Sequence, residues 1–564
     1  MRHLKKTEVD AIPAGALVDY LGSWCFQKPC LGIDKNYSVF PYIWQDKIKL
    51  NQDSVKVSKI CKILFGKFSE ILNEIHGENL PIRYWKILTQ SWFDNYVHTF
   101  YDRYKNIIKY RKLTGDFSYK TLEPEKFVTP LDMREMKYLC EHNGLFNEQL
   151  YSQILDSTYN QHIKFYADSD YKWIIPHARL SSKIVLSSLY CSLETTQEIK
   201  TNLDKLGEIS IYPQLENGFD SYSLSTRRLI FDTVGSECKS RFEELFFKSL
   251  VINTPKLIIE ALGDVRKYIL SNVMLPKLMV TTVSHDDCFL AQLIMAESTK
   301  IGGKIIWGQH GPDYGALYLR PERNHEFENP DKYLCWGWAD SNDKHKKNLP
   351  SLSISERKKF DTVNDNYGPL LFISNASGKY IKTLSTGTFS TDFTNYSKNQ
   401  CVFIEKLQRR ISDNMSYRPY LNDYGQGIID NVQKLKPSID YIYGGNIDKL
   451  YNKFRLIVMD MPYTSFGTLL ALNKPSILIL EKNNYFYNPK FSHVFELLYI
   501  AGILHYCPIK AADFVNRVFV KPNNWWNSDD AQNARIEYIK YFANNDINYS
   551  SIWADNLLKE YNNN

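Results

Sequence analysis

The second half of this 564-residue chain alternates short apolar runs with helical patterns, and it does so twice. An apolar run over 278–283, a helical pattern over about 287–299 and a second apolar run over 304–307 predict a strand–helix–strand unit. The segment 455–480 repeats this order. Short apolar strands that alternate with helices favour parallel sheets covered on both faces. We therefore expect an α/β fold with two Rossmann-like domains, whose strand-end loops face a central cleft.

The first half has a different pattern. Apolar residues at helical spacing predict helices over 57–76 and 81–113, with Gly77 ending the first, and a third helical block covers about 225–250. A polar stretch over 341–368 separates the two alternating regions, which predicts a domain boundary near 345–367. The last residues, from about 529, are again helical. We expect a helix-rich N-terminal part and C-terminal helices that pack back on the body.

Charge and cysteine content exclude several classes of protein. Lys plus Arg exceed Asp plus Glu by 69 to 63, which is too small an excess for a nucleic-acid partner. The ten cysteines are scattered without a Cys-x-x-Cys pair, so a structural zinc site is not expected and a reducing compartment is. There is neither a signal-peptide pattern nor an apolar run of about 18 residues. These features predict a cytoplasmic protein, compatible with loose attachment at the inner membrane.

The most suggestive polar loop is "GQHGPDYG", residues 308–315, which directly follows the predicted strand 304–307. Ligands bind at the carboxyl ends of strands in such domains, and His310 is a candidate base. Asp313 could orient that base, act as a second base or attack a sugar carbon. We expect Gly308, Gly311 and Gly315 to allow close backbone approach and positive φ. The alternative is a tight turn that carries a hydrogen-bonded histidine.

The preceding strand ends in "SHDD", residues 284–287, which should lie beside the His310 loop because sequential strands are usually neighbours. Asp286 and Asp287 are further candidates for a catalytic carboxylate, and His285 is a weaker one. The structural alternative is that one of them caps the following helix.

Three segments of the C-terminal half carry residue types that bind phosphate: hydroxyl groups, an amide, a lysine and an arginine, at strand ends or at a predicted helix start. These candidates are Ser374, Asn375 and Lys379, then Arg418, then Tyr463, Thr464 and Ser465. A polar turn, a surface ion pair and simple helix capping are the respective structural alternatives.

Several longer motifs resemble a known family. "LGSWCF", "LNEIHGENLPIRYWKIL", "FYDRYKN", "GQHGPDYG", "YLCWGW", "YRPYLNDYG" and the section from "YTSFGTLLALNKPSI" to "GILHYCP" occur in this order between about residues 18 and 558. They resemble transferases encoded in bacterial O-antigen and other surface-polysaccharide gene clusters. The second half is similar to the nucleotide-binding half of GT-B glycosyltransferases. It is distantly similar to CMP-Kdo and CMP-sialic-acid-type transferases and to CDP-glycerol polymerases, which carry a related His-Gly loop.

The resemblance implies a GT-B-like architecture. Residues 1–350 would form the acceptor-side domain, 366–525 the domain that binds the nucleotide donor, and 526–564 the C-terminal helices. It also implies site roles for Gln309, His310, Gly311, Tyr314 and Gly315. It implies none for Asp313, because Pro312 and Asp313 stand where the family has a glycine-rich loop.

The function expected from these features is a glycosyltransferase that moves a sugar from a nucleotide-activated donor, a CMP-activated Kdo or nonulosonic acid, to a surface-glycan acceptor. The partners expected are this donor and a glycan or lipid-linked glycan acceptor, with no cofactor and no required metal; peripheral contact with glycan-assembly proteins is also compatible. The residues leave two alternatives open. One is a transferase of polyol phosphate from a CDP-activated alcohol, and the other is a non-catalytic subunit that binds sugar nucleotides.

Overall fold

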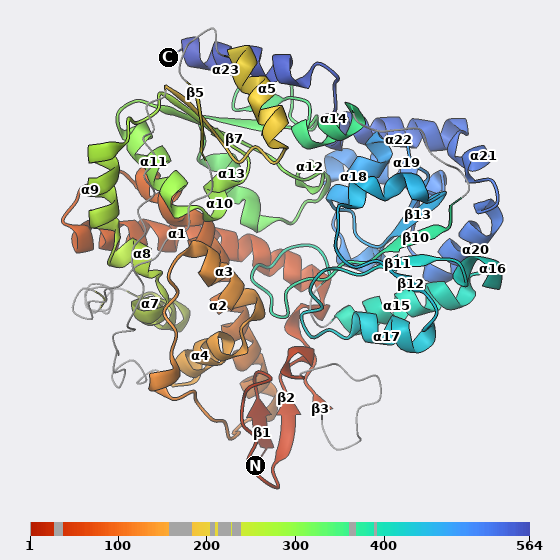
Figure 1. The fold of residues 1–564 in the computed structure, drawn as a ribbon. Helices are drawn as coiled ribbons and strands as arrows, with labels where there is room; N and C mark the ends of the chain where they lie inside the picture. The colour runs from red at the N-terminus through yellow and green to blue at the C-terminus, as the bar shows by residue number, and fades with distance from the viewer. Residues whose placement is uncertain are drawn as a thin grey trace.

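The computed structural model describes residues 2–26, 38–156, 183–203, 209–212, 227, 238–359, 368–388 and 392–563. The chain forms two α/β halves side by side, each built on a parallel sheet with helices packed against it (Figure 1). The predicted fold class, two Rossmann-like halves with additional helices, is confirmed. The region of the predicted domain boundary, 345–367, contains β9 (Lys346–Asn348) and α14 (Leu352–Lys359), and its last part, 360–367, lies outside the described residues.

The N-terminal sheet has the order β5-β4-β6-β7-β8-β9 in the described part of the chain, and every pair is parallel. The strands are β4 (Ile184–Ser187), β5 (Ile209–Tyr212), β6 (Leu278–Thr281), β7 (Lys304–Gly308), β8 (Lys332–Cys335) and β9 (Lys346–Asn348). β4 and β6 are buried throughout, which explains their uninterrupted apolar sequences.

The predicted helix over about 287–299 is α11 (Phe289–Lys300). A separate single turn, α10 (Ser284–Asp287), precedes it, and the backbone at Cys288 between the two is extended. Neither Asp286 nor Asp287 caps α11, so the capping alternative for these carboxylates is wrong.

A helical bundle packs against this sheet. Its helices are α1 (Lys47–His76), α2 (Ile82–Thr114), α3 (Met133–His142), α4 (Gly144–Leu155), α7 (Arg241–Asn253), α8 (Lys256–Ile259) and α9 (Leu262–Asn272). Gly77 ends α1 at φ 61°, as predicted. The helix begins ten residues earlier than predicted, at Lys47, where the side chain of Asp46 caps it. α7 overlaps the end of the predicted block 225–250, most of whose remainder lies outside the described residues. A small parallel sheet, β1 (Arg2–Lys5), β2 (Leu17–Tyr20) and β3 (Ser38–Val39), was not predicted because strands of two to four residues give almost no periodic signal.

The C-terminal sheet has the order β12-β11-β10-β13-β14-β15 within the described residues, again all parallel. Its strands are β10 (Leu370–Ile373), β11 (Ser416–Arg418), β12 (Asp440–Tyr441), β13 (Leu456–Met459), β14 (Ser476–Ile479) and β15 (Leu504–His505). Helices α15 (Phe393–Lys406), α17 (Ile428–Leu435), α18 (Thr464–Ala471), α19 (Ser492–Ile500) and α20 (Pro508–Val518) pack around it.

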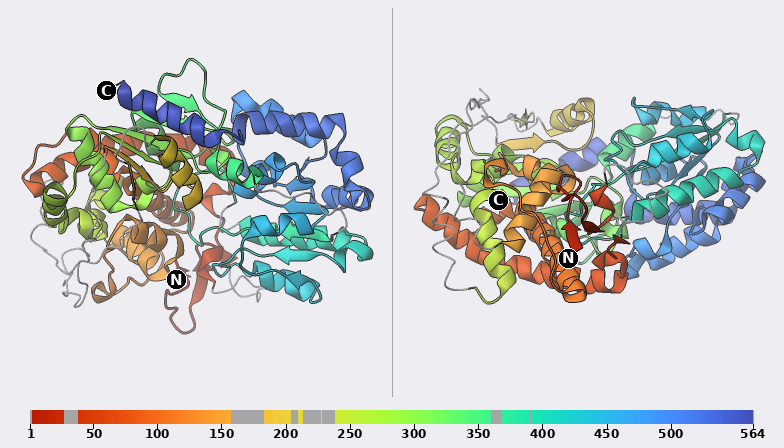
Figure 2. Two further views of the ribbon diagram at one scale, coloured as in Figure 1. Left: turned by 45° about the horizontal axis from the view of Figure 1, so that its top comes forward. Right: turned by 90° about the horizontal axis from the view of Figure 1, so that it is seen from below.

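Two segments of the C-terminal half pack into the N-terminal half. Residues 376–388, here called the strap, leave β10 and place Tyr380 and Leu384 in the core that contains α2. The last helix, α23 (Tyr549–Asn562), lies beside α5 (Leu193–Leu203) at the N-terminal sheet (Figures 1 and 2). Helix α22 (Asp529–Phe542) packs on α18 and α19. No helix among the described residues is both long and apolar enough to cross a bilayer.

Candidate active site

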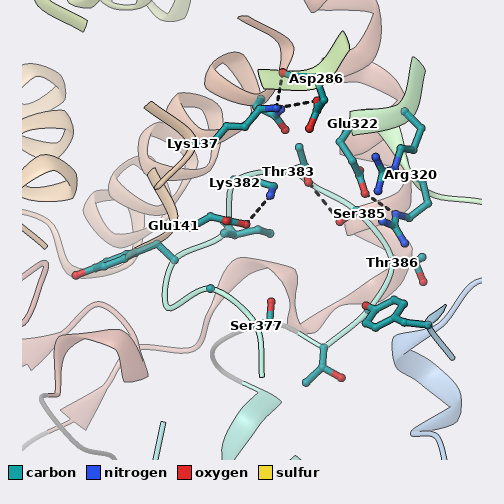
Figure 3. A pocket seen from close by; sticks show the side chains of 18 of the residues that line it. Lys137, Glu141, Asp286, Arg320, Glu322, Ser377, Lys382, Thr383, Ser385 and Thr386 are labelled. Atoms are coloured by element: carbon teal, nitrogen blue, oxygen red, sulfur yellow. Dashed lines mark hydrogen bonds and ion pairs between the residues drawn. The ribbon is translucent and has the colours of Figure 1, made fainter. Parts of the chain in front are cut away.

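A cavity of about 240 Å³ lies between the two halves, beside the carboxyl ends of β6 and β7. Its walls come from α2, α3 and α10, the loop after β7, residues 320–323, the strap and the residue that precedes α18. Figure 3 shows the side chains that line it, with the strap along one side. The lining residues used below are Lys137, Glu141, Asp286, His310, Arg320, Glu322, Arg323, Ser377, Lys382 and Tyr463.

His310 projects from the end of β7 into this cavity. Its Nδ1 lies 2.9 Å from the carbonyl oxygen of Thr282. Because a carbonyl can only accept a hydrogen bond, this contact places the proton on Nδ1 and leaves Nε2 as an acceptor. The hydroxyl of Tyr314 lies beside the ring, 2.9 Å from Nδ1 and 3.2 Å from Nε2. Burial, followed by the positive charge of Arg323, lowers the pKa of His310 to about 4, so the ring is neutral near pH 7.

The glycines of the His310 loop allow close packing, but none of them has the positive φ that we expected. A Cβ at Gly308 would lie 3.1 Å from Thr282, and one at Gly315 would lie 2.2 Å from the ring of Trp338. At Gly311 a Cβ would lie 2.6 Å from the carboxylate of Asp313. Steric room, rather than backbone freedom, is what requires glycine at these positions.

Gln309 and Asp313 make internal contacts that hold the loop. Oε1 of Gln309 accepts hydrogen bonds from the backbone of Trp336 and, at 2.5 Å, from Nε1 of Trp338. Its Nε2 donates to the carbonyl of Gly311. The buried carboxylate of Asp313 lies 2.5 Å from Arg320. The polar atoms of Gln309 and the carboxylate of Asp313 are therefore engaged in contacts within the protein.

The two aspartates of α10 have separate environments. Asp286 lines the cavity and pairs with Lys137 at 2.7 Å. Burial would raise the pKa of its carboxyl, but Lys137 and the other basic groups around it together outweigh this effect and hold the pKa well below its usual value. Asp287 is directed to Arg134 at 3.2 Å and is not among the residues that line the cavity.

The cationic side chains of the cavity were not singled out from the sequence. Lys137, Arg320, Arg323 and Lys382 all line it. They pair with acidic groups: Lys382 with Glu141 at 2.8 Å, Arg323 with Glu326 at 2.6 Å, and Arg320 with Glu322 as well as Asp313. The segment "LRPER", residues 319–323, was the available signal, since it places two arginines shortly after His310. Lys137 and Lys382 are brought in only by tertiary packing.

The phosphate-binding residues predicted at the ends of β10 and β11 make other contacts and do not line the cavity. Ser374 is buried and accepts a hydrogen bond from Gln400, and Asn375 accepts one from the backbone of Ala376. Lys379 pairs with Glu8 of the N-terminal segment at 3.0 Å. Arg418 donates to the carbonyls of Gly444 and Gly445. Among them, none is a lining residue of the cavity, although Ser377 and Gly378 of the strap are.

The start of α18 lies against the His310 loop. Tyr463 lines the cavity, and Thr464 and Ser465 form the first turn of the helix, partly exposed. Thr464 Oγ1 would lie 3.7 Å from a Cβ at Gly311, and Gly467 lies against Pro312. The His310 loop and a helix N-terminus of the C-terminal half therefore meet at this cavity.

Behind the cavity wall, His285, His325 and Glu326 are buried together. Each offers one atom that could ligate a metal ion, and the three atoms lie within 4.8 Å of one another. Nitrogen and carboxylate oxygen donors of this kind suit a divalent transition metal.

Comparisons with known proteins give one match that extends over nearly the whole chain. The sequence profile of a family described as "LIC12162 family transferase" matches residues 10–557. A comparison with curated proteins gives no match.

The fold is also similar, distantly, to solved structures. An alpha,alpha-trehalose-phosphate synthase (UDP-forming) from Burkholderia vietnamiensis is 11% identical, with a TM-score of 0.37 over 69% of this chain and 100% of that chain. UDP-GlcNAc 2-epimerase from Neisseria meningitidis bound to UDP-GlcNAc is 12% identical, with a TM-score of 0.36 over 67% and 99%. The wall teichoic acid polymerase TagF is 10% identical, with a TM-score of 0.33 over 69% and 91%. Similarities this distant carry no inference about substrate or mechanism.

Proposed function

Because the chain belongs to the LIC12162 family of transferases, we propose that it is a glycosyltransferase whose reaction takes place in the cavity between its two halves. One observation carries this proposal: a neutral histidine whose Nε2 is an acceptor lines the same cavity as two arginines and two lysines. A base for the acceptor hydroxyl and cations for a leaving phosphate are the groups that sugar transfer from a nucleotide donor requires.

In this proposal Nε2 of His310 accepts the proton of the acceptor hydroxyl, while the hydrogen bond from Nδ1 to Thr282 holds the ring. The pKa of about 4 makes the free ring a weak base. A polyanionic donor beside Arg323 would offset one of the charges that lower this pKa, so donor binding would strengthen the base. Transfer by this route inverts the anomeric centre. Asp286, which also lines the cavity, is the alternative base or nucleophile.

The donor phosphate would lie between Arg320, Arg323 and the first turn of α18, where backbone N–H groups and the helix dipole favour negative charge. These groups could offset the charge of the leaving nucleotide without a metal ion at the phosphate. We further propose a CMP-activated acidic sugar, Kdo or a nonulosonic acid, as the donor. Lys137 and Lys382 support an acidic sugar, because they add positive charge next to the arginines.

A thermal-shift comparison of CMP, CDP, UDP, GDP and TDP tests the proposal, since a ligand that binds the folded state raises the midpoint of unfolding. We expect CMP to give the largest shift, and Arg323→Gln to reduce it. Stabilisation by UDP or GDP alone would contradict a CMP donor. A response to CDP together with a phosphodiester product would instead indicate transfer of a polyol phosphate, and no response to any nucleotide would favour a scaffold role that needs no nucleotide.

A further inference from the structure

The buried group formed by His285, His325 and Glu326, here called the histidine cluster, lies behind the wall that carries His310. His285 belongs to α10, and His325 and Glu326 belong to α13 (Asn324–Glu328). Their exposed fractions are 0%, 1% and 0%. Two imidazoles and a carboxylate thus share a space that is closed to solvent.

The hydrogen bonding of the cluster is incomplete. Within the described residues, neither ring nitrogen of His285 has a hydrogen-bond partner, and neither does Nε2 of His325. Nε2 of His285 lies 3.2 Å from Oε2 of Glu326, but without hydrogen-bond geometry. A buried polar atom left without a partner is destabilising. One imidazole can offer only one nitrogen to an ion, so an ion at this place would satisfy one nitrogen of His285 together with Nε2 of His325.

We propose that the histidine cluster binds one divalent transition-metal ion of the Zn²⁺ class. Zinc bonds to nitrogen and oxygen are about 2.0–2.2 Å long, so neighbouring ligands in a tetrahedron lie roughly 3.3–3.5 Å apart. The 3.2 Å contact between His285 and Glu326 is close to this separation, and one donor atom of each of the three residues lies within 4.8 Å of the others. Two nitrogens and a carboxylate favour zinc over magnesium or calcium, which prefer oxygen donors.

The surroundings of the cluster fit a metal site. Oε1 of Glu326 accepts a hydrogen bond from Arg323 at 2.6 Å, and Oε2 accepts one from the hydroxyl of Tyr333 at 3.3 Å. The ring of Trp307 stacks on His285 with a centroid separation of 4.6 Å. Groups of this kind orient metal ligands.

Asp286 lies beside the cluster. Its Oδ1 is 3.6 Å from Nε2 of His325, on the side of the cluster that faces the cavity, and the same oxygen pairs with Lys137 at 2.7 Å. A water bound to the ion would complete four-coordination and could donate a hydrogen bond to Asp286. The ion would join α10 to α13 and so fix Asp286 and Arg323, two residues of the cavity wall. It would not need to touch the donor phosphate, and the inference is independent of the proposed function.

Metal analysis of the purified full-length protein, followed by titration of the chelator-stripped protein with Co²⁺, tests this inference. We expect about one equivalent of zinc in the protein as purified. Co²⁺ should produce visible d–d absorption that saturates at one equivalent and should raise the midpoint of thermal unfolding. A protein that contains no stoichiometric metal, and that shows neither Co²⁺ absorption nor a thermal shift, would overturn the proposal. The cluster would then be a buried contact of His285 with Glu326 and nothing more.

Variants assign the ion to the cluster. Glu326→Gln preserves the size of the side chain, and it and His325→Ala should each weaken Co²⁺ binding by about tenfold or more. His493→Ala is the control, because His493 is 51% exposed and lies outside the cluster. Unchanged Co²⁺ affinity in a folded Glu326→Gln or His325→Ala protein would show that the ion binds elsewhere and would also overturn the proposal. The titration of the unmodified protein remains decisive if a variant does not fold.

Discussion

At the residue scale, the chemistry of His310 is set by the group on each side of its ring. The carbonyl of Thr282 can only accept, so it fixes the proton on Nδ1, and Nε2 is left for Tyr314 or for an acceptor hydroxyl. The sequence predicted His310 from its place after an apolar strand. It could not predict the tautomer, because Thr282 lies on the neighbouring strand end, 28 residues away.

His310→Ala should lower turnover by about a hundredfold or more, because the proposed base is removed. The thermal midpoint should change little, since His310 is only partly buried. Nucleotide release from the donor identified by thermal shift is the measurement, and the exposed His493→Ala is its matched control. Full activity in His310→Ala would remove His310 from the mechanism and leave Asp286 as the candidate.

His98 should make the stability of the protein depend on pH. It is buried in α2, its Nδ1 accepts a hydrogen bond from the backbone N–H of Leu384, and burial lowers its pKa to about 4. In the unfolded chain the pKa is about 6.5. Between these values the unfolded state binds more protons, so stability is lost as the pH falls from about 6.5 to 4, by up to roughly 3 kcal/mol.

Unfolding measured across this pH range in the native protein and in His98→Asn tests the prediction. The asparagine amide offers an oxygen acceptor at a similar position and does not titrate. The variant should therefore lose less stability on acidification. Equal losses in both proteins would assign the acid sensitivity to other groups, such as His325, whose pKa burial also lowers to about 4.

At the element scale, the strap follows a strand end that was predicted to bind phosphate, and in the structure it connects the two halves. The sequence after β10 was expected to bind phosphate through Ser374, Asn375 and Lys379. In the structure this chain continues into the N-terminal half, where Lys379 pairs with Glu8, and the strap from residue 377 lines the cavity. The hydroxyl of Tyr380 also contacts Glu8. The strap therefore ties the two halves together at the edge of the cavity.

Leu384→Ala should destabilise this connection. Leu384 is fully buried among residues of α2, and truncation of a buried leucine costs about 2–5 kcal/mol. We expect a lower midpoint of urea unfolding and faster proteolysis within residues 376–388. Leu421→Ala is the matched control, because Leu421 is 81% exposed. If both variants unfold at the midpoint of the native protein, the strap does not contribute to stability.

The elements themselves were predicted well where their pattern is long. Helices α1 and α2, with 30 and 33 residues, have many periodic positions, and strands β6, β7 and β13 end within two residues of the expected places. The turn α10 was missed because its four residues, Ser-His-Asp-Asp, include no apolar position that would indicate a helix. It packs against α2, and the backbone at Cys288 between α10 and α11 is extended.

At the scale of the whole molecule, the C-terminal helix α23 completes the core of the N-terminal half. Tyr549, Trp553 and Leu557 pack with Leu186, Val280 and Ile306 of the N-terminal sheet, among others. The chain therefore begins and ends in the same half, and the two halves are not consecutive in sequence.

Trp553→Ala should destabilise the N-terminal half although residue 553 lies far along the chain. Trp553 is 2% exposed and donates from Nε1 to the carbonyl of Pro350, and loss of a buried tryptophan costs about 3–5 kcal/mol. Hydrogen exchange should then increase in β4, β6 and β7, with less change in β13 and β14. Ile547→Ala, at a position 78% exposed, is the control. Exchange that increases only in the C-terminal sheet would contradict this assignment.

The sequence by itself determined the fold class and placed His310 at a strand end, because period, burial and turn residues act over a few neighbouring positions. The tertiary structure decided which side chains share the cavity. Lys137 comes from α3, Lys382 from the strap and Tyr463 from the residue before α18, three positions far apart in the sequence. The histidine cluster likewise brings α10 and α13 together. Long-range packing sets these juxtapositions, and no local pattern in the chain encodes them.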